Sequence, residues 1–219
     1  FLIYYNGWKG EMNANNVSSL IYENPYISLD YKILNSTRHN NKFSGIKGHL
    51  NSNISYNLKA SFDNIQNAVF FRTDSTNQHL FQKETTNVDL LNMSFELTMK
   101  INDMFELILD GDYYNYDMNG KPWHMPEAKL GLIANYNIAD KVNFSTSINY
   151  WSTTENMTFV NKSEIIPSFI DANLHMNYNY RENISFKIML NNLLGKTYNR
   201  WANYPVVGFN GMAGIQFSF

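Results

Sequence analysis

Hydrophobic and polar residues alternate along several stretches of the chain. In residues 93–101, Met, Phe, Leu, Met and Ile occupy every second position, and Ser, Glu, Thr and Lys fill the positions between them. Successive side chains of a β-strand point to opposite faces, so this stretch predicts a strand with one apolar and one polar face. The same alternation recurs in residues 27–33, 54–63, 142–151, 170–180 and 206–219.

Most of these stretches are long for strands. They run for roughly nine to thirteen residues, whereas strands of soluble proteins usually have about five or six. A strand tilted by about 45° needs about nine to eleven residues to cross a bilayer. Length and alternation together favour strands that span a membrane. The soluble alternative is a β-sandwich or a β-propeller, in which strands also alternate.

The connections between the stretches differ in length. Short polar turns are expected at residues 51–53, 102–103, 139–141 and 181–183, and longer links at 72–86, 117–125, 152–167 and 195–205. Short turns at one end and long loops at the other are typical of outer-membrane barrels. The sequence therefore predicts an all-β fold, a transmembrane antiparallel up-and-down β-barrel, with about 10–12 strands in this segment.

Composition agrees with this interpretation. Charged residues make up 16% of the chain, below the usual value of about 25%. Aromatic residues make up another 16%, and such rings suit a membrane–water boundary. The net charge of −2 and the lack of a basic stripe argue against nucleic acid as a partner. The chain has no cysteine, which excludes a thiolate nucleophile, a cysteine metal site and a disulfide.

The predicted outer loops carry the candidate ligand-binding residues. Trp123 and His124 lie in one loop, and Tyr198, Arg200 and Trp201 lie in another. Aromatic rings beside an arginine can stack on a sugar, a ring or an anionic siderophore. The alternative is that these rings belong to the aromatic girdle of the barrel.

Two further groups could carry chemistry. His175 shares a predicted lumen face with Asp171, and Glu106, Asp110 and Asp112 share one face of another strand. Such groups could act as acid and base or bind a cation, but a polar barrel interior is the preferred explanation for them. We therefore predict no catalytic residue, no metal site and no cofactor, with a barrel hydrolase as the least favoured alternative.

The end of the chain carries a candidate assembly signal. In residues 214–219, the apolar side chains of Ile215, Phe217 and Phe219 alternate with Gly, Gln and Ser. An amphipathic final strand with an aromatic end can pair with an open barrel seam by β-augmentation. These three residues are expected to be read by the outer-membrane assembly machinery.

The last part of the chain resembles the end of TonB-dependent outer-membrane receptors. The similarity lies in Ile-Pro-Ser-Phe-Ile-Asp-Ala-Asn-Leu at 166–174, Asn-Asn-Leu-Leu-Gly-Lys-Thr-Tyr at 191–198 and Tyr-Pro-Val-Val-Gly-Phe at 204–209. Phe209 stands where that family often has Arg, and Leu194 stands where it often has Phe. The Asn-, Lys- and Ile-rich composition is similar to that of Bacteroidetes-type members.

This resemblance implies a function and a set of partners. Receptors of the family have a barrel of about 22 strands and an N-terminal plug. Residues 1–219 would then be the C-terminal part of an outer-membrane barrel, with the plug domain not in this chain. The chain would take part in uptake of a siderophore, haem, cobalamin, glycan or peptide. Its partners would be outer-membrane lipid, a TonB-type energising protein that contacts a missing N-terminal region, and a surface lipoprotein.

A self-contained small barrel is the alternative to a receptor fragment. It would act as a porin, an adhesin or an assembly partner, and it requires the 219 residues to close a barrel alone.

Overall fold

The computed structural model describes residues 1–12, 28–29, 37–74, 80–139, 141–158 and 162–218. Most of the predicted strand at 27–33 lies outside these residues, as does Phe219 of the candidate assembly signal. Among the described residues, no helix is long and apolar enough to cross a membrane.

All regular elements in the described residues are strands. They are β1 (Leu2–Met12), β2 (Ser28–Leu29), β3 (Thr37–Asn51), β4 (Ile54–Thr73), β5 (Leu80–Lys100), β6 (Phe105–Met118), β7 (Ala128–Ile138), β8 (Val142–Trp151), β9 (Thr154–Met157), β10 (Ser163–Ile166), β11 (Phe169–Arg181), β12 (Ile184–Asn191), β13 (Asn199–Trp201), β14 (Tyr204–Pro205) and β15 (Asn210–Phe217).

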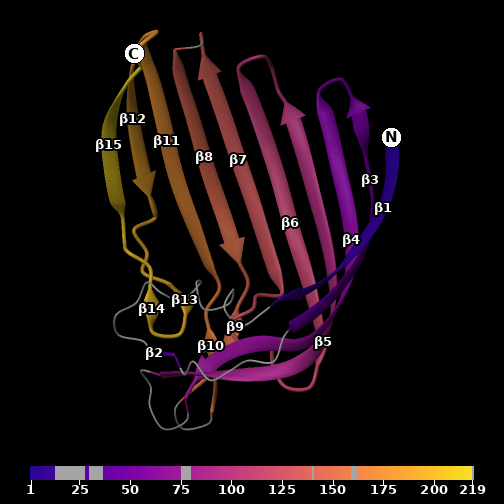
Figure 1. Ribbon diagram of the computed structural model, residues 1–219. Coiled ribbons are helices and arrows are strands. Elements are labelled where there is room, and N and C mark those ends of the chain that lie inside the picture. The colour runs from indigo at the N-terminus through magenta and orange to yellow at the C-terminus, as the bar shows by residue number, and fades with distance from the viewer. Residues whose placement is uncertain (13–27, 30–36, 75–79, 140, 159–161, 219) are drawn as a thin grey trace.

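Eleven of the described strands form one curved sheet (Figure 1). Its order is β1-β3-β4-β5-β6-β7-β8-β11-β12-β15, with β2 paired in parallel to β5. Along that path every pair is antiparallel, which confirms the predicted up-and-down arrangement. Within the described residues β1 and β15 are the two edges of the sheet and do not pair with each other.

The two ends of the sheet differ as predicted. The short turns lie at one end, together with both termini of the chain (upper end in Figure 1). The opposite end carries the longer connections, two of which contain small hairpins, β9–β10 and β13–β14.

Two strand boundaries depart from the sequence prediction. The link expected at 72–86 is mostly strand, because β4 and β5 stay paired from Ala68 opposite Thr86 to Thr73 opposite Phe81. Residues 68–71 are Ala-Val-Phe-Phe, which favour strand, and Ala68 and Phe70 are buried against neighbouring loops. The last strand starts at Asn210 rather than at 206, because Tyr204–Pro205 pairs within a separate hairpin.

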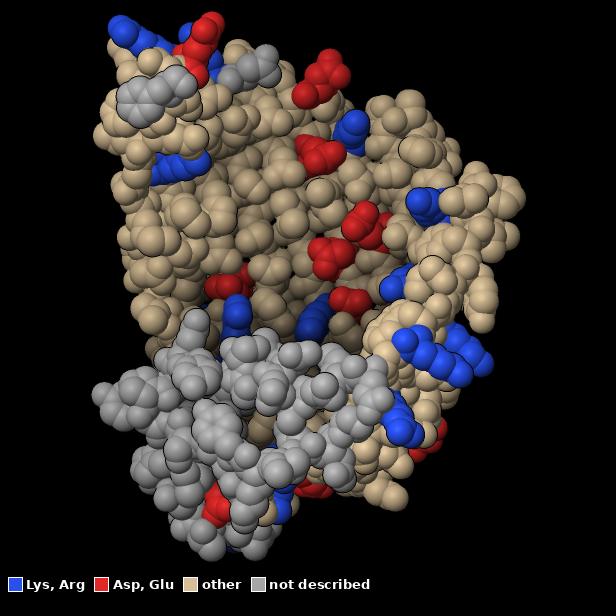
Figure 2. All heavy atoms as spheres, in the orientation of Figure 1, with Lys and Arg blue, Asp and Glu red and all other residues tan. Residues whose placement is uncertain are grey.

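The strand register sorts apolar and polar side chains onto different faces. One row across the sheet contains Leu58, Phe95, Gly111, Leu130, Tyr150 and Ile170. The adjacent row contains Lys59, Ser94, Asp112, Lys129 and Trp151. Acidic and basic side chains gather on the hollowed face in Figure 2, so the polar rows line the concave face and the apolar rows the convex face.

A compact core lies at the loop end of the sheet, where β4 and β5 meet the loops. Ala68, Phe70, Val88 and Trp123 are buried together, with Tyr116, Met125 and Met157 among the side chains packed around them. The long β4–β5 hairpin thus supports the loops that follow β6 and β8, and it fixes the position of the candidate site.

Candidate ligand site at the loop end

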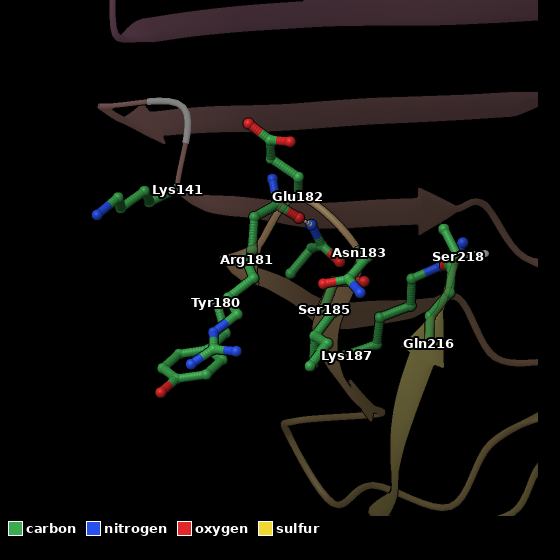
Figure 3. Close-up of a pocket in the computed structure, with 12 residues that line it drawn as sticks. Lys141, Tyr180, Arg181, Glu182, Asn183, Ser185, Lys187, Gln216 and Ser218 are labelled. Atoms are coloured by element: carbon green, nitrogen blue, oxygen red, sulfur yellow. Dashed lines mark hydrogen bonds between the residues drawn. The ribbon is translucent and has the colours of Figure 1, made fainter.

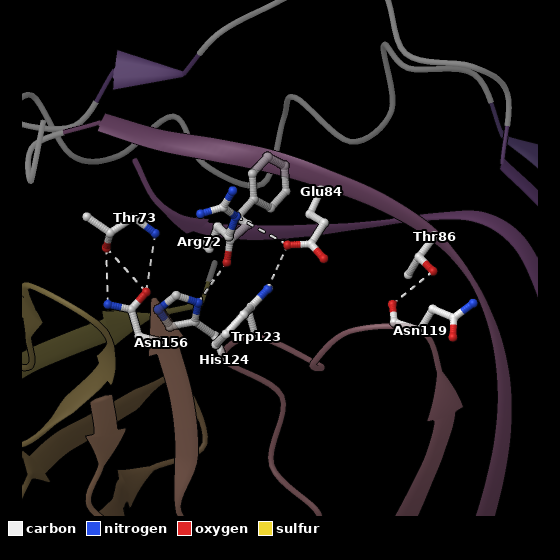
Figure 4. Close-up of polar contacts among 9 residues, drawn as sticks. Arg72, Thr73, Glu84, Thr86, Asn119, Trp123, His124 and Asn156 are labelled. Carbon is white, nitrogen blue, oxygen red and sulfur yellow. Dashed lines mark hydrogen bonds and ion pairs between the residues drawn. The ribbon is translucent and has the colours of Figure 1, made fainter. Parts of the chain in front are cut away.

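Trp123 lies inside the loop-end core rather than on its surface. Its side chain is only 4% exposed, and its indole Nε1 donates a hydrogen bond to Glu84 Oε2 at 2.9 Å (Figure 4). The same oxygen lies 3.2 Å from Arg72 Nε. Trp123 therefore anchors the segment between β6 and β7 to the β4–β5 hairpin, which gives it a packing role.

His124 is also buried, with 4% exposure, and its backbone has a positive φ of 60°. Its Nδ1 lies 2.9 Å from the carbonyl oxygen of Phe71, and its ring stacks on Trp201. Burial lowers the pKa of His124 to about 4, against a smaller opposing effect of the Phe71 hydrogen bond. The imidazole is therefore neutral near pH 7, and Nδ1 is the nitrogen that donates to Phe71.

The β9–β10 hairpin is held against the same core by polar contacts. Asn156 is less than 2% exposed, its Nδ2 donates to Thr73 Oγ1 at 3.1 Å, and its Oδ1 accepts from the Thr73 amide at 3.3 Å (Figure 4). Nearby, Glu155 accepts hydrogen bonds from Lys121 and from Ser163, and these contacts lower the pKa of Glu155. Three separate segments are thereby joined at the loop end.

A ladder of aromatic rings stands where the concave face meets the loops. The Phe169 ring stacks on Trp151 at 4.9 Å on one side and on Tyr198 at 4.1 Å on the other. The Arg200 guanidinium lies 5.1 Å from the Trp151 ring centroid, and its Nη2 lies 3.9 Å from Asp171 Oδ2. We call Trp151, Phe169, Asp171, Tyr198 and Arg200 the rim cluster.

The rim cluster has the chemistry of a ligand contact. The Arg200 side chain is 53% exposed, whereas that of Asp171, its acidic neighbour, is only 10% exposed. Burial and the negative charge of Asp171 raise the pKa of Tyr198, so the phenol stays neutral. Stacked rings next to an accessible guanidinium can bind planar or anionic groups.

The five residues predicted from the loops are therefore not brought into one exposed site. Trp123 and His124 are buried, Trp201 is half-buried against His124, and only Tyr198 and Arg200 join the rim cluster. The sequence prediction missed Trp151 and Phe169, which end one strand and begin another. Their strand positions, opposite each other in the β8–β11 register, are the signal that could have found them.

The other sequence candidates lie on the concave wall. Glu96 is opposite Asp110, and Asp112 follows two residues later on the same face. His175 is exposed and faces Ser145 and Met189 in the register, with no acid opposite it. Within the described residues no group of three or more His, Asp or Glu side chains is arranged to hold a metal ion.

A depression lies at the opposite end of the concave face from the rim cluster, among the short turns. It has a volume of about 750 Å³, and Lys141, Arg181, Glu182 and Lys187 are among its lining residues (Figure 3). Most of its lining residues are polar or charged, and none of the predicted ligand residues lines it.

Comparison with family models and with curated proteins finds no match for this sequence. Solved structures do match. FpvA of Pseudomonas aeruginosa, solved bound to heterologous pyoverdines, has a TM-score of 0.69 at 14% identity, over 99% of this chain and 31% of that one. The ferric-catecholate import receptor Fiu from Escherichia coli K12 gives 0.68 at 13% identity, over 99% and 33%. The siderophore receptor PiuA from Acinetobacter baumannii gives 0.68 at 13% identity, over 99% and 34%.

These matches concern the fold. The chain spans about a third of the length of each of these receptors, and almost all of it is covered. At 13–14% identity the similarity carries no information about the ligand. The chain therefore has the fold of part of the β-barrel wall found in outer-membrane siderophore receptors.

Proposed function

We propose that residues 1–219 form the C-terminal part of a TonB-dependent outer-membrane receptor barrel and take part in ligand uptake. The observation that carries this proposal is the match of nearly the whole chain to about a third of the length of known receptor chains. An open sheet with an apolar convex face and a polar concave face supports the same conclusion. The plug would belong to a part of the protein outside this chain.

The two faces suggest how the chain would sit in the membrane. The apolar convex face would contact outer-membrane lipid, and the polar concave face would line the lumen. The loop end would face the outside and the short turns would face the periplasm, since outer-membrane barrels usually have long extracellular loops and short periplasmic turns. The rim cluster would then stand at the outer mouth of the lumen, where an incoming ligand first meets the wall.

Ligand class, partners and subgroup are further parts of the proposal. The ligand would be a siderophore, haem, cobalamin, glycan or peptide, with no catalytic step. The partners would be a TonB-type energising protein, the outer-membrane assembly machinery and a surface lipoprotein. A Bacteroidetes-type origin rests on composition alone, since the structural neighbours come from Pseudomonas, Escherichia and Acinetobacter.

Uptake in cells that lack their own receptors tests the proposal. The full-length protein that contains this chain is expressed in a receptor-deficient strain and supplied with iron-55 siderophores, haem and cyanocobalamin in turn. We expect accumulation of one ligand that stops when the proton gradient is collapsed or TonB is deleted. Passive uptake that is insensitive to both treatments would instead establish a porin.

A further inference from the structure

Basic side chains extend beyond the apolar belt on the convex face of β1 and β3. In the register, Ser44 is opposite Ala60, Lys42 is opposite Phe62, and Asn40 is opposite Asn64. On β1, Lys9 lies opposite Asn40, and Arg38 occupies the next convex position along β3. Lys42, Lys9 and Arg38 therefore stand on three successive rows, each about 7 Å from the last.

A groove runs through the apolar side chains of the convex face, next to the row of Lys42 and on the side away from the loop end. Small side chains at Ser44, Ala60 and Ala128, together with Gly111, lie between the larger side chains of this face. Among the larger ones, Leu58, Met93 and Leu130 are each nearly half exposed. At Gly111 an added Cβ would come within 2.4 Å of the Phe95 ring, so this ring lies flat against the sheet. The groove has a volume of about 680 Å³, with an almost wholly apolar lining.

The three basic residues are available to a ligand. Lys9, Arg38 and Lys42 are all exposed, and within the described side chains none of them pairs with a carboxylate. Two open depressions lie beside the basic residues, one lined by Tyr5 and Lys42 and the other by Lys9 and Arg38. Gly7 is opposite Lys42, and the lysine Cγ lies 3.7 Å from the point where a Cβ of residue 7 would stand, so the lysine stem lies over this glycine.

Acidic residues border this strip on the side of β5 and β6. Asp89 and Asp117 continue the row of Asn40 and Asn64 onto these two strands. Along this row, which starts at Lys9 on β1, the convex face thus changes from basic to acidic by β5.

We propose that this strip and groove bind one phosphate-bearing, acylated lipid of the outer leaflet. The phosphate would be held by Lys42, Lys9 and Arg38, and an acyl chain would lie in the groove beside Ala60. Cations immediately beyond an apolar surface match the two halves of such a lipid, which neither free phosphate nor an uncharged lipid does. The inference rests on the proposed membrane orientation and adds a lipid site on the outside of the barrel wall.

Lipid binding to the purified full-length protein tests the inference. The probes are bis-phosphorylated hexa-acyl lipid A, the same lipid after removal of its phosphates, and inorganic phosphate, each added to the protein in detergent and counted by native mass spectrometry. The headgroup variant is K9Q/R38Q/K42Q. Its matched control is K47Q/K59Q, which removes lysines from the concave face of β3 and β4. The groove variant is Ala60→Phe, and Ile148→Phe is its control on the convex face outside the groove.

We expect the headgroup variant to bind phosphorylated lipid at least about tenfold more weakly than the parent, with little change for the dephosphorylated lipid. Ala60→Phe should weaken the binding of both lipids, and the controls should bind like the parent. Unchanged binding by the headgroup variant would overturn the inference, as would equal affinity for inorganic phosphate. Heat-modifiable gel mobility verifies that each variant is folded. Ligand uptake is measured separately. If the parent protein takes up ligand but does not bind lipid, only the lipid site is contradicted. If it binds lipid but does not take up ligand, only the proposed function is contradicted.

Discussion

The imidazole of His124 lies face to face with the indole of Trp201, with ring centroids 4.6 Å apart and planes 8° from parallel. His124 belongs to the segment between β6 and β7, and Trp201 belongs to β13. Phe71 of β4 contacts both, through its carbonyl to His124 and its ring to Trp201 at 6.2 Å. The segment between β6 and β7, strand β13 and the β4–β5 hairpin thus meet at the His124 ring, which is neutral at pH 7.

Acid should therefore loosen the loop end. The pKa of His124 is lowered from the ordinary value of 6.5 to about 4, so the opened state binds a proton that the closed state does not. The stabilisation that the neutral imidazole gives to the closed loop end is complete above pH 6.5. It falls as the pH drops from 6.5 to 4, and the total loss of stability is at most about 3 kcal/mol. Hydrogen exchange of residues 119–127, corrected for intrinsic rates, should rise over this interval.

The matched variant for this experiment is His124→Phe, which keeps an aromatic ring but cannot titrate. Its exchange should be independent of pH between 6.5 and 4. An equal rise in the variant and the parent would show that another group controls the opening.

Asn156 should be the main polar anchor of the β9–β10 hairpin. Asn156→Ala removes all its side-chain hydrogen bonds to Thr73 and leaves the buried Thr73 amide and hydroxyl without these partners. A loss of roughly 1–3 kcal/mol in local stability is expected. Amide exchange at Thr73 and along β9 measures it, and Asn53→Ala at an exposed turn is the control. Unchanged protection at Thr73 would contradict this role.

The rim cluster should govern ligand affinity, whereas the buried loop residues should not. Arg200→Gln and Trp151→Leu remove the accessible charge and the ring beneath it, and each should weaken uptake at low concentration by about tenfold. The probe is whichever of the siderophores, haem or cyanocobalamin gives energised uptake. Trp123→Phe should change affinity little, because its side chain faces the loop-end core. Lys196→Gln, an exposed neighbour, is the control.

The strands of the sheet could be predicted because the alternation of apolar and polar residues lies within each strand and does not depend on the rest of the chain. Alternation in residues 93–101 and 170–180 assigns each side chain to a face, and the register confirms that assignment for residues 93–100 and 170–179. The boundaries of β4 and β5 could not be predicted, because their extension is stabilised by contacts with Trp123 in a distant loop.

The candidate site was only partly predictable for a related reason. Tyr198 and Arg200 were found because aromatic and basic residues stand out in a loop. The burial of His124 depends on Phe71 and Trp201, which lie far away in the sequence. The pairing of Arg200 with Asp171 and Trp151 likewise arises only when three separate elements meet.

The last strand should matter for assembly more than for stability. Phe217 is 58% exposed at an edge of the described sheet and pairs only with Ile184 of β12. Phe217→Ala should therefore lower the folded yield in the outer membrane several-fold, since an apolar edge is what an assembly partner would recognise. Refolding of the same variant in detergent should be nearly normal. Equal losses in both settings would point to simple destabilisation instead.

Neighbouring residues of β8 provide a direct test of which face meets lipid. Ile148 is 42% exposed in the convex row with Leu132 and Ala172, whereas Ser147 is opposite Ile133 and Asn173 in the adjacent concave row. Ile148→Arg would place a charge in hydrocarbon and should cost about 2–4 kcal/mol when the full-length protein is refolded in lipid vesicles. Ser147→Arg would place the same charge in a hydrated lumen and should cost much less, because the guanidinium keeps its water. Urea titration of both variants, followed by gel mobility, measures the difference. A larger loss for Ser147→Arg would mean that the polar face is the one packed against an apolar environment, and the proposed orientation of the wall would then be wrong.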